Sequence, residues 1–147
     1  MKKRSNTFRY GLVLLIFISS LSQVIAQNLV PNPSFEELDM CPLTGGFGGP
    51  TVAPPWVAPT LGTCDIFNEC NNPGAVGVPM NFAGSQDALS GVGYAGFYTR
   101  VLSNPYREYI QAPLDEPLVA GSWYSVNFFV SLAESNSCAI QNIGAYF

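Results

Sequence analysis

The stretch NLVPNPSFE, at residues 28–36, is the most informative part of this 147-residue chain. It predicts a first β-strand over 28–35 that leads into a long loop. Pro31 and Pro33 lack the backbone N–H that a sheet ladder uses, so this strand is expected at a sheet edge or as an irregular entry. Trp56 follows the loop, directly behind two prolines.

Residues 1–26 are predicted to be a cleavable signal peptide. Its start is basic (Lys2, Lys3, Arg4 and Arg9), and its apolar run at 11–21 is shorter than the about 20 residues that a membrane span needs. The small residues at 24–26 predict cleavage after Ala26. The alternative is that residues 1–26 stay on the protein as an uncleaved N-terminal membrane anchor. The mature chain, 27–147, is expected to be exported to the periplasm, the outer-membrane surface or the extracellular space, without a membrane span.

The mature chain is strongly acidic. Two basic residues, Arg100 and Arg107, remain against ten acidic ones, which gives a net charge of −8. Such a surface repels nucleic acid, so no nucleic-acid partner is expected. The chain has no His, which excludes Ser-His-Asp and Cys-His catalysis.

Short apolar runs between glycines and prolines predict an all-β fold. Strands are expected at 93–98, 106–114, 123–132 and 139–147. The clearest period-2 pattern is at 123–132, where Tyr124, Val126, Phe128, Val130 and Leu132 share one side. That side is expected to face the core.

Four cysteines in an exported chain predict disulfide bonds. Four cysteines allow three pairings, and the residues alone do not choose among them. No pair has CxxC spacing, and without His a zinc site is not expected.

The first stretch resembles the start of galactose-binding-like jelly-roll modules, a group that includes many carbohydrate-binding modules. The matching residues are Asn28, Leu29, Asn32, Phe35, Glu36 and Trp56, and the later stretch 117–128 also fits. The resemblance implies that 27–147 is a jelly-roll β-sandwich. About six strands are expected, whereas a jelly roll has eight. The module is therefore expected to be incomplete at its C-terminus.

A closer resemblance is to exported envelope proteins of gliding-type Bacteroidetes. In these the module precedes an OmpA-like peptidoglycan-binding domain or a secretion sorting tail. The similar pieces run through the mature chain, at 39–42, 65–70, 77–81, 94–96, 107–111, 130–133 and 139–144. The resemblance implies a disulfide between Cys41 and Cys70, which leaves Cys64 and Cys138 as a second bridge or as free thiols.

Two kinds of binding site follow from the jelly-roll resemblance and from residue chemistry. A structural Ca²⁺ is implied near Glu36, with Glu37 or Asp39 as further oxygen ligands; a solvated acidic loop is the alternative. A sugar site is predicted where Arg107, Tyr109 and Gln111 alternate onto one face of their strand. Two more residues are assigned to this site: Asn127, on a later strand, and Trp56, which is either a stacking platform or a core plug.

The predicted function is non-catalytic glycan binding or surface adhesion, with a glycan or cell-wall polysaccharide as partner. The alternative is a purely structural module that presents a downstream peptidoglycan-anchoring or sorting domain. A glycoside hydrolase that uses two carboxylates is a minor alternative.

Overall fold

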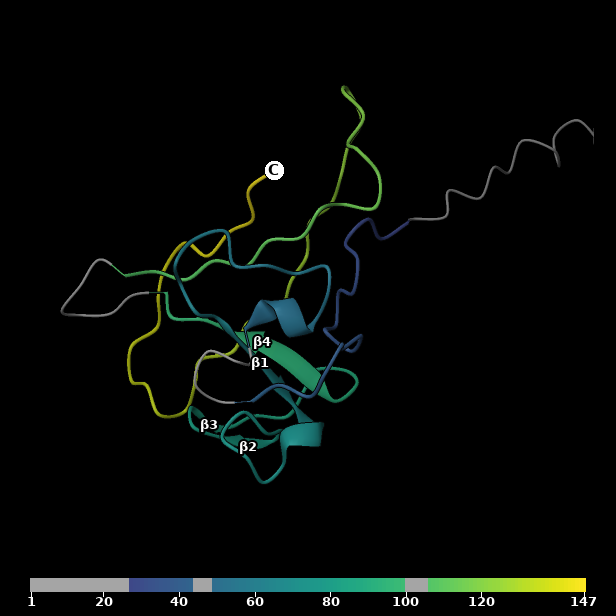
Figure 1. Cartoon of the computed structure of the whole chain (residues 1–147). Helices are drawn as coiled ribbons and strands as arrows, with labels where there is room; N and C mark the ends of the chain where they lie inside the picture. The colour runs from purple at the N-terminus through teal and green to yellow at the C-terminus, as the bar shows by residue number, and fades with distance from the viewer. Residues whose placement is uncertain (1–26, 44–48, 100–105) are drawn as a thin grey trace, which may run out of the picture.

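The computed structural model describes residues 27–43, 49–99 and 106–147 (Figure 1). Its elements are two short 3₁₀ helices, η1 (Pro50–Val52) and η2 (Glu69–Asn71), and four strands, β1 (Asp65–Asn68), β2 (Met80–Asn81), β3 (Gly84–Ser85) and β4 (Gly93–Gly96). No α-helix occurs in these ranges, so the all-β class is confirmed. No helix found there is long and apolar enough to cross a membrane. The predicted signal peptide, 1–26, lies outside the described residues.

The centre of the fold is an antiparallel pair of strands, β1 and β4, in which Ile66 lies opposite Ala95 and Phe67 opposite Tyr94. Successive side chains of a strand point to opposite faces. Ile66 therefore packs on one face with Val52 and Ala53, and Phe67 packs on the other face in a second small core. These two cores draw all their side chains from residues between Phe35 and Ile110.

Strand β4 confirms the strand predicted at 93–98, in a shorter form. A Cβ at Gly96 would lie 2.6 Å from Cε2 of Phe67, so a larger residue there would displace the ring. The same ring stacks on Tyr94, with centroids 5.1 Å apart. The second sheet is the two-stranded hairpin of β2 and β3.

The strand predicted at 28–35 is wrong. The stretch forms a turn in which Asn32 and Phe35 have φ of 41° and 60°. Two prolines leave this stretch with few ladder donors, and Asn tolerates the left-handed conformation that a turn requires. Side-chain hydrogen bonds of Asn32 then fix the turn.

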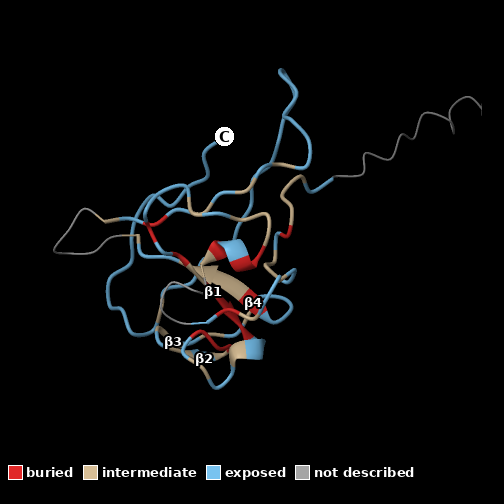
Figure 2. Ribbon diagram, in the orientation of Figure 1, coloured by how far each residue is buried: buried red, intermediate tan, exposed pale blue. Residues whose placement is uncertain are grey.

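The strands predicted at 106–114, 123–132 and 139–147 are also wrong. Gln111 makes a single bridge with Val57, and the other two segments pair with no described residue. Figure 2 shows the C-terminal segment almost wholly exposed. A period-2 pattern forms a strand only if another strand pairs with it, and beyond the single bridge at Gln111 these segments form no strand ladder with described residues. The jelly-roll arrangement therefore stays a prediction.

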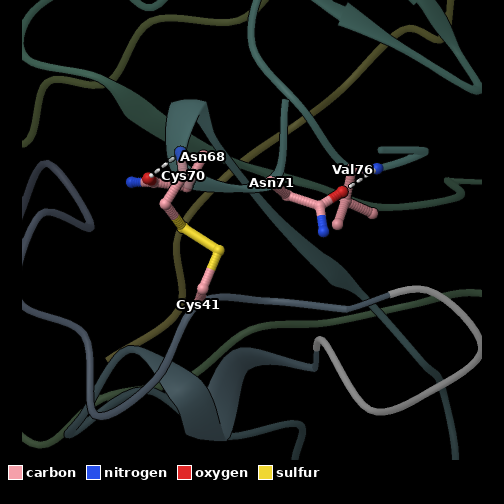
Figure 3. Close-up of a disulfide and its surroundings, with 5 residues drawn as sticks. All are labelled: Cys41, Asn68, Cys70, Asn71 and Val76. Carbon is pink, nitrogen blue, oxygen red and sulfur yellow. Dashed lines mark hydrogen bonds between the residues drawn. A yellow bond between two sulfur atoms is a disulfide. The ribbon is translucent and has the colours of Figure 1, made fainter. Parts of the chain in front are cut away.

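The disulfide between Cys41 and Cys70 confirms the pairing that the family resemblance implied (Figure 3). Its Cα atoms are 6.0 Å apart, and it joins the acidic loop to η2. Asn68 caps η2 by accepting a hydrogen bond from the backbone N–H of Cys70 (3.0 Å). The second bridge considered from the sequence is not formed: Cys64 is a buried free thiol and Cys138 an exposed one.

Candidate functional site

The segment 106–111 lies against Val57 and against residues 63–64, which lead into β1. Backbone hydrogen bonds of 2.8 and 2.9 Å join Val57 and Gln111, and the Cys64 thiol donates to the carbonyl oxygen of Tyr109 (3.4 Å). Glu108 and Ile110 are directed inward, and Ile110 packs on the core cluster that contains Ile66. The intervening side chains are left on the outside.

Glu108 is a buried carboxylate, with 4% of its surface exposed. One oxygen accepts from the backbone N–H of Thr63 (3.1 Å) and from the hydroxyl of Tyr106 (3.0 Å). The other accepts from the backbone N–H of Tyr98 (2.6 Å). The Thr63 hydroxyl is a further donor at 3.3 Å. Several donors thus replace the water that a buried charge has lost, as burial of a carboxylate requires.

The buried charge perturbs its neighbours. Burial, with the charge of Glu108 as a second cause, raises the pKa of Asp65 to about 6. Burial, again followed by Glu108, raises the pKa of the Cys64 thiol to about 11. Since the thiolate is the reactive form, Cys64 is an inert thiol at neutral pH.

The outward side of the same segment carries Arg107, Tyr109 and Gln111, all exposed. We call these three residues the outer face. Tyr109 is 49% exposed, and Val57, across the bridge from Gln111, is 42% exposed. The structure thus brings together three of the five residues predicted for a sugar site, on a segment whose inward side is held by Glu108 and Ile110.

The other two predicted sugar residues lie elsewhere. Trp56 is partly buried; its indole N–H donates to the carbonyl oxygen of Asn32 (2.9 Å), and its ring lies 5.1 Å from Phe35. The bridge to the outer-face segment is made by its neighbour Val57 and not by Trp56 itself. Asn127 is exposed and donates to the hydroxyl of Ser125 (2.9 Å).

The residues implied for calcium are spread along the first loop. Glu36 accepts from the backbone N–H groups of Val92 (2.9 Å) and Gly93 (3.0 Å). Glu37 and Asp39 are exposed. Within 27–43, 49–99 and 106–147, no group of three or more His, Cys, Asp or Glu side chains could hold a metal ion. The calcium site stays a prediction, and the observed role of Glu36 is to fasten the first turn to β4.

Glu108, Thr63 and Asp65 belong to no motif that singles them out as a site. The signal that could have found Glu108 is the alternation along 107–111, which places it on the same side as Ile110 and opposite to Arg107. The contact with Thr63 spans 45 positions of the sequence, and no local pattern predicts it.

Comparison of the chain with protein-family models, curated proteins and solved structures finds no match. The functional argument therefore rests on the residues described above.

Proposed function

We propose that this chain is an exported, non-catalytic β-module that binds a glycan or cell-wall polysaccharide through the outer face. We further propose that the module has a jelly-roll fold and belongs to the Bacteroidetes envelope family. Both of these proposals rest on the sequence resemblance. The observation that carries the binding proposal is the exposure of Arg107, Tyr109 and Gln111 side by side on one extended segment.

The chemistry of the outer face suits a sugar. A guanidinium fork and a side-chain amide each offer paired hydrogen bonds to neighbouring hydroxyl groups. A tyrosine ring offers an apolar surface to the C–H side of a pyranose. The hydrogen bonds of Glu108 and the packing of Ile110 hold the backbone of this segment in place before a ligand binds. This preorganisation favours binding, because less conformational entropy is lost.

A non-catalytic role is favoured over a glycosidase. A hydrolase of this kind needs two carboxyl groups that reach the glycosidic bond. The raised pKa of Asp65 would suit a general acid. Its neighbour Glu108 is 4% exposed, however, and its oxygens already accept internal hydrogen bonds.

The structural-module alternative has an observation of its own. Glu36 and Trp56, which are also expected to act in binding, both make hydrogen bonds inside the fold. In this second candidate function, the chain only positions a neighbouring cell-wall-anchoring or sorting domain.

A polysaccharide pull-down and a glycan array with the full ectodomain separate the two candidates. Tyr109→Ala and Arg107→Ala are expected to lower binding at least about tenfold, since each removes a contact group of the outer face. Tyr146→Ala is the matched control, because Tyr146 is fully exposed elsewhere on the chain. Absence of binding to any polysaccharide would leave the structural module, and equal losses in Tyr109→Ala and Tyr146→Ala would refute the assignment to this face.

A further inference from the structure

The start of the segment 106–111 is held to the fold by the side chain of Glu108 rather than by a strand ladder. Its backbone–backbone hydrogen bonds to described residues are the bridge of Gln111 with Val57 and one bond from the N–H of Glu108 to the carbonyl oxygen of Tyr98 (2.9 Å). The Glu108 carboxylate accepts two more, from the backbone N–H groups of Thr63 (3.1 Å) and Tyr98 (2.6 Å). The position of 106–108 therefore depends on this carboxylate.

The Glu108 side chain is enclosed as well as hydrogen-bonded. It is 4% exposed, and a Cβ at buried Gly62 would lie 3.1 Å from both its Cα and its Cγ. The hydroxyl groups of Tyr106 (3.0 Å) and Thr63 (3.3 Å) are further donors to the same carboxylate. Because the side chain has so little space around it, the carboxylate reaches water only if the segment that carries it moves.

A second acid, Asp65, lies beside this carboxylate. It begins β1, two positions after Thr63, and is partly buried. Burial, followed by the charge of Glu108, raises the pKa of Asp65 to about 6. Ionisation of both acids in a place that water reaches poorly is unfavourable, so a proton on Asp65 favours the closed arrangement.

The other described groups around the two acids do not offset their charge. Burial, and after it the charges of both acids, raise the pKa of the Cys64 thiol to about 11, so this thiol is neutral at pH 7. Tyr98 contributes its backbone N–H, and Tyr106 its hydroxyl. Arg107 is exposed on the outer face, and Arg100 lies outside the described residues. Beyond residue 26 the chain has no Lys or His.

We propose that Asp65 and Glu108 form a proton-sensitive clamp on the start of the outer-face segment. While Asp65 carries a proton, Glu108 holds 106–108 against its two backbone donors. Loss of that proton favours an opening in which 106–108 lift away, because opening returns both carboxylates to water and separates their charges. The bridge at Gln111 holds the other end of the segment. Arg107 moves with the clamp; a consequence for glycan binding rests on the proposed function, whereas the opening itself does not.

Amide hydrogen exchange of the full chain, followed by NMR, tests the clamp at the N–H groups of Thr63 and Tyr98. Protection factors, corrected for the intrinsic exchange rate at each pH, report how often these hydrogen bonds open. Opening releases the Asp65 proton between about pH 4 and about pH 6, since the pKa of Asp65 is raised from 3.8 to about 6 in the closed chain. Protection of both amides is therefore expected to fall at least about fivefold from about pH 4.5 to about pH 7.

Two variants assign this fall to Asp65. Asp65→Asn is expected to keep the same protection of both amides at the two pH values. Asp115→Asn is the matched control, because Asp115 is exposed elsewhere on the chain, and it should retain the wild-type fall. Wild-type protection that does not change with pH, or a fall that persists in Asp65→Asn, overturns the proposal. The wild-type profile decides by itself where Asp65→Asn fails to fold.

Comparison with other amides separates local opening from unfolding of the whole chain. We expect the amides of Thr63 and Tyr98 to be less protected than the most protected amides of β1 and β4. If all of these amides are equally protected and lose protection together as pH rises, the opening is global and the clamp does not exist. No glycan enters these measurements, so an absence of glycan binding, which would refute the proposed function, leaves this test unaffected.

Discussion

Replacing Asn32 by alanine tests whether the first turn holds the N-terminal part of the fold together. The Asn32 side chain is buried and makes three hydrogen bonds. Its amide donates to the carbonyl oxygens of Glu37 (2.9 Å) and Pro54 (3.0 Å), and its oxygen accepts from the backbone N–H of Glu37 (3.1 Å). The variant Asn32→Ala removes all three and leaves their backbone partners without them.

The size of the effect follows from these contacts. Three hydrogen bonds contribute about 0.5–1.5 kcal/mol each, and a left-handed φ costs alanine about 1 kcal/mol more than asparagine. The φ of Asn32 is 41°. Asn32→Ala is therefore expected to lower the free energy of unfolding by about 2.5–5.5 kcal/mol. At a urea m-value of about 2 kcal/mol/M, the midpoint falls by about 1.3–2.8 M.

Tryptophan fluorescence during urea unfolding is the measurement. Trp56 reports on the turn, because its indole N–H donates to Asn32 and its ring contacts Phe35. The other tryptophan, Trp123, is fully exposed in the folded chain and contributes little change.

Asn28→Ala is the matched control for this measurement. Asn28 is exposed and accepts a single hydrogen bond from the backbone N–H of Val30 (3.1 Å). We expect this control to lose less than about 1 kcal/mol. If Asn32→Ala loses no more stability than Asn28→Ala, the turn does not hold this part of the fold, and the reasoning fails.

Three further predictions concern ionisation and sulfur. The pKa of Asp65 is raised from 3.8 to about 6, first by burial, so the folded chain keeps a proton there that the unfolded chain releases. The free energy of unfolding is therefore expected to fall as pH rises from about 4 to about 6, by about 1 kcal/mol after allowance for solvent screening. Urea titrations at several pH values measure this slope, and the variant Asp65→Asn should lack it. Replacing both Cys41 and Cys70 by serine removes a cross-link between positions 29 apart, and calorimetry should show a loss of about 3–4 kcal/mol. A thiol reagent at pH 8 should modify exposed Cys138 in the folded chain, whereas buried Cys64, whose pKa is about 11, should react only after urea unfolds the chain. Equal modification rates of the two thiols in the folded state would contradict this prediction.

Several features of the fold follow from local sequence. The all-β class follows from short apolar runs between glycines and prolines. The strand at β4 follows from its own residues, because glycine at Gly96 leaves room for the ring of Phe67. The alternation along 107–111 correctly separates exposed Arg107 and Tyr109 from buried Glu108, since an extended chain turns successive side chains to opposite sides.

Other features depend on partners that local sequence does not name. The stretch 28–35 has residues that fit a strand, but the side chain of Asn32 finds partners at Glu37 and Pro54, and a turn results. The stretch 123–132 has the clearest strand pattern of the chain, yet it pairs with no described residue. A strand needs a second strand, and the pattern of one segment does not supply it.

The sequence by itself determined the acidic charge, the absence of histidine chemistry and the sidedness of the extended segments, because each of these depends on residue type and spacing alone. Only the tertiary structure decided that Glu108 is buried beneath the outer face, that Trp56 is tied to Asn32, and that Cys64 stays a free thiol. The physical reason is that burial and hydrogen bonding join groups distant in sequence, as the contact between Thr63 and Glu108 does.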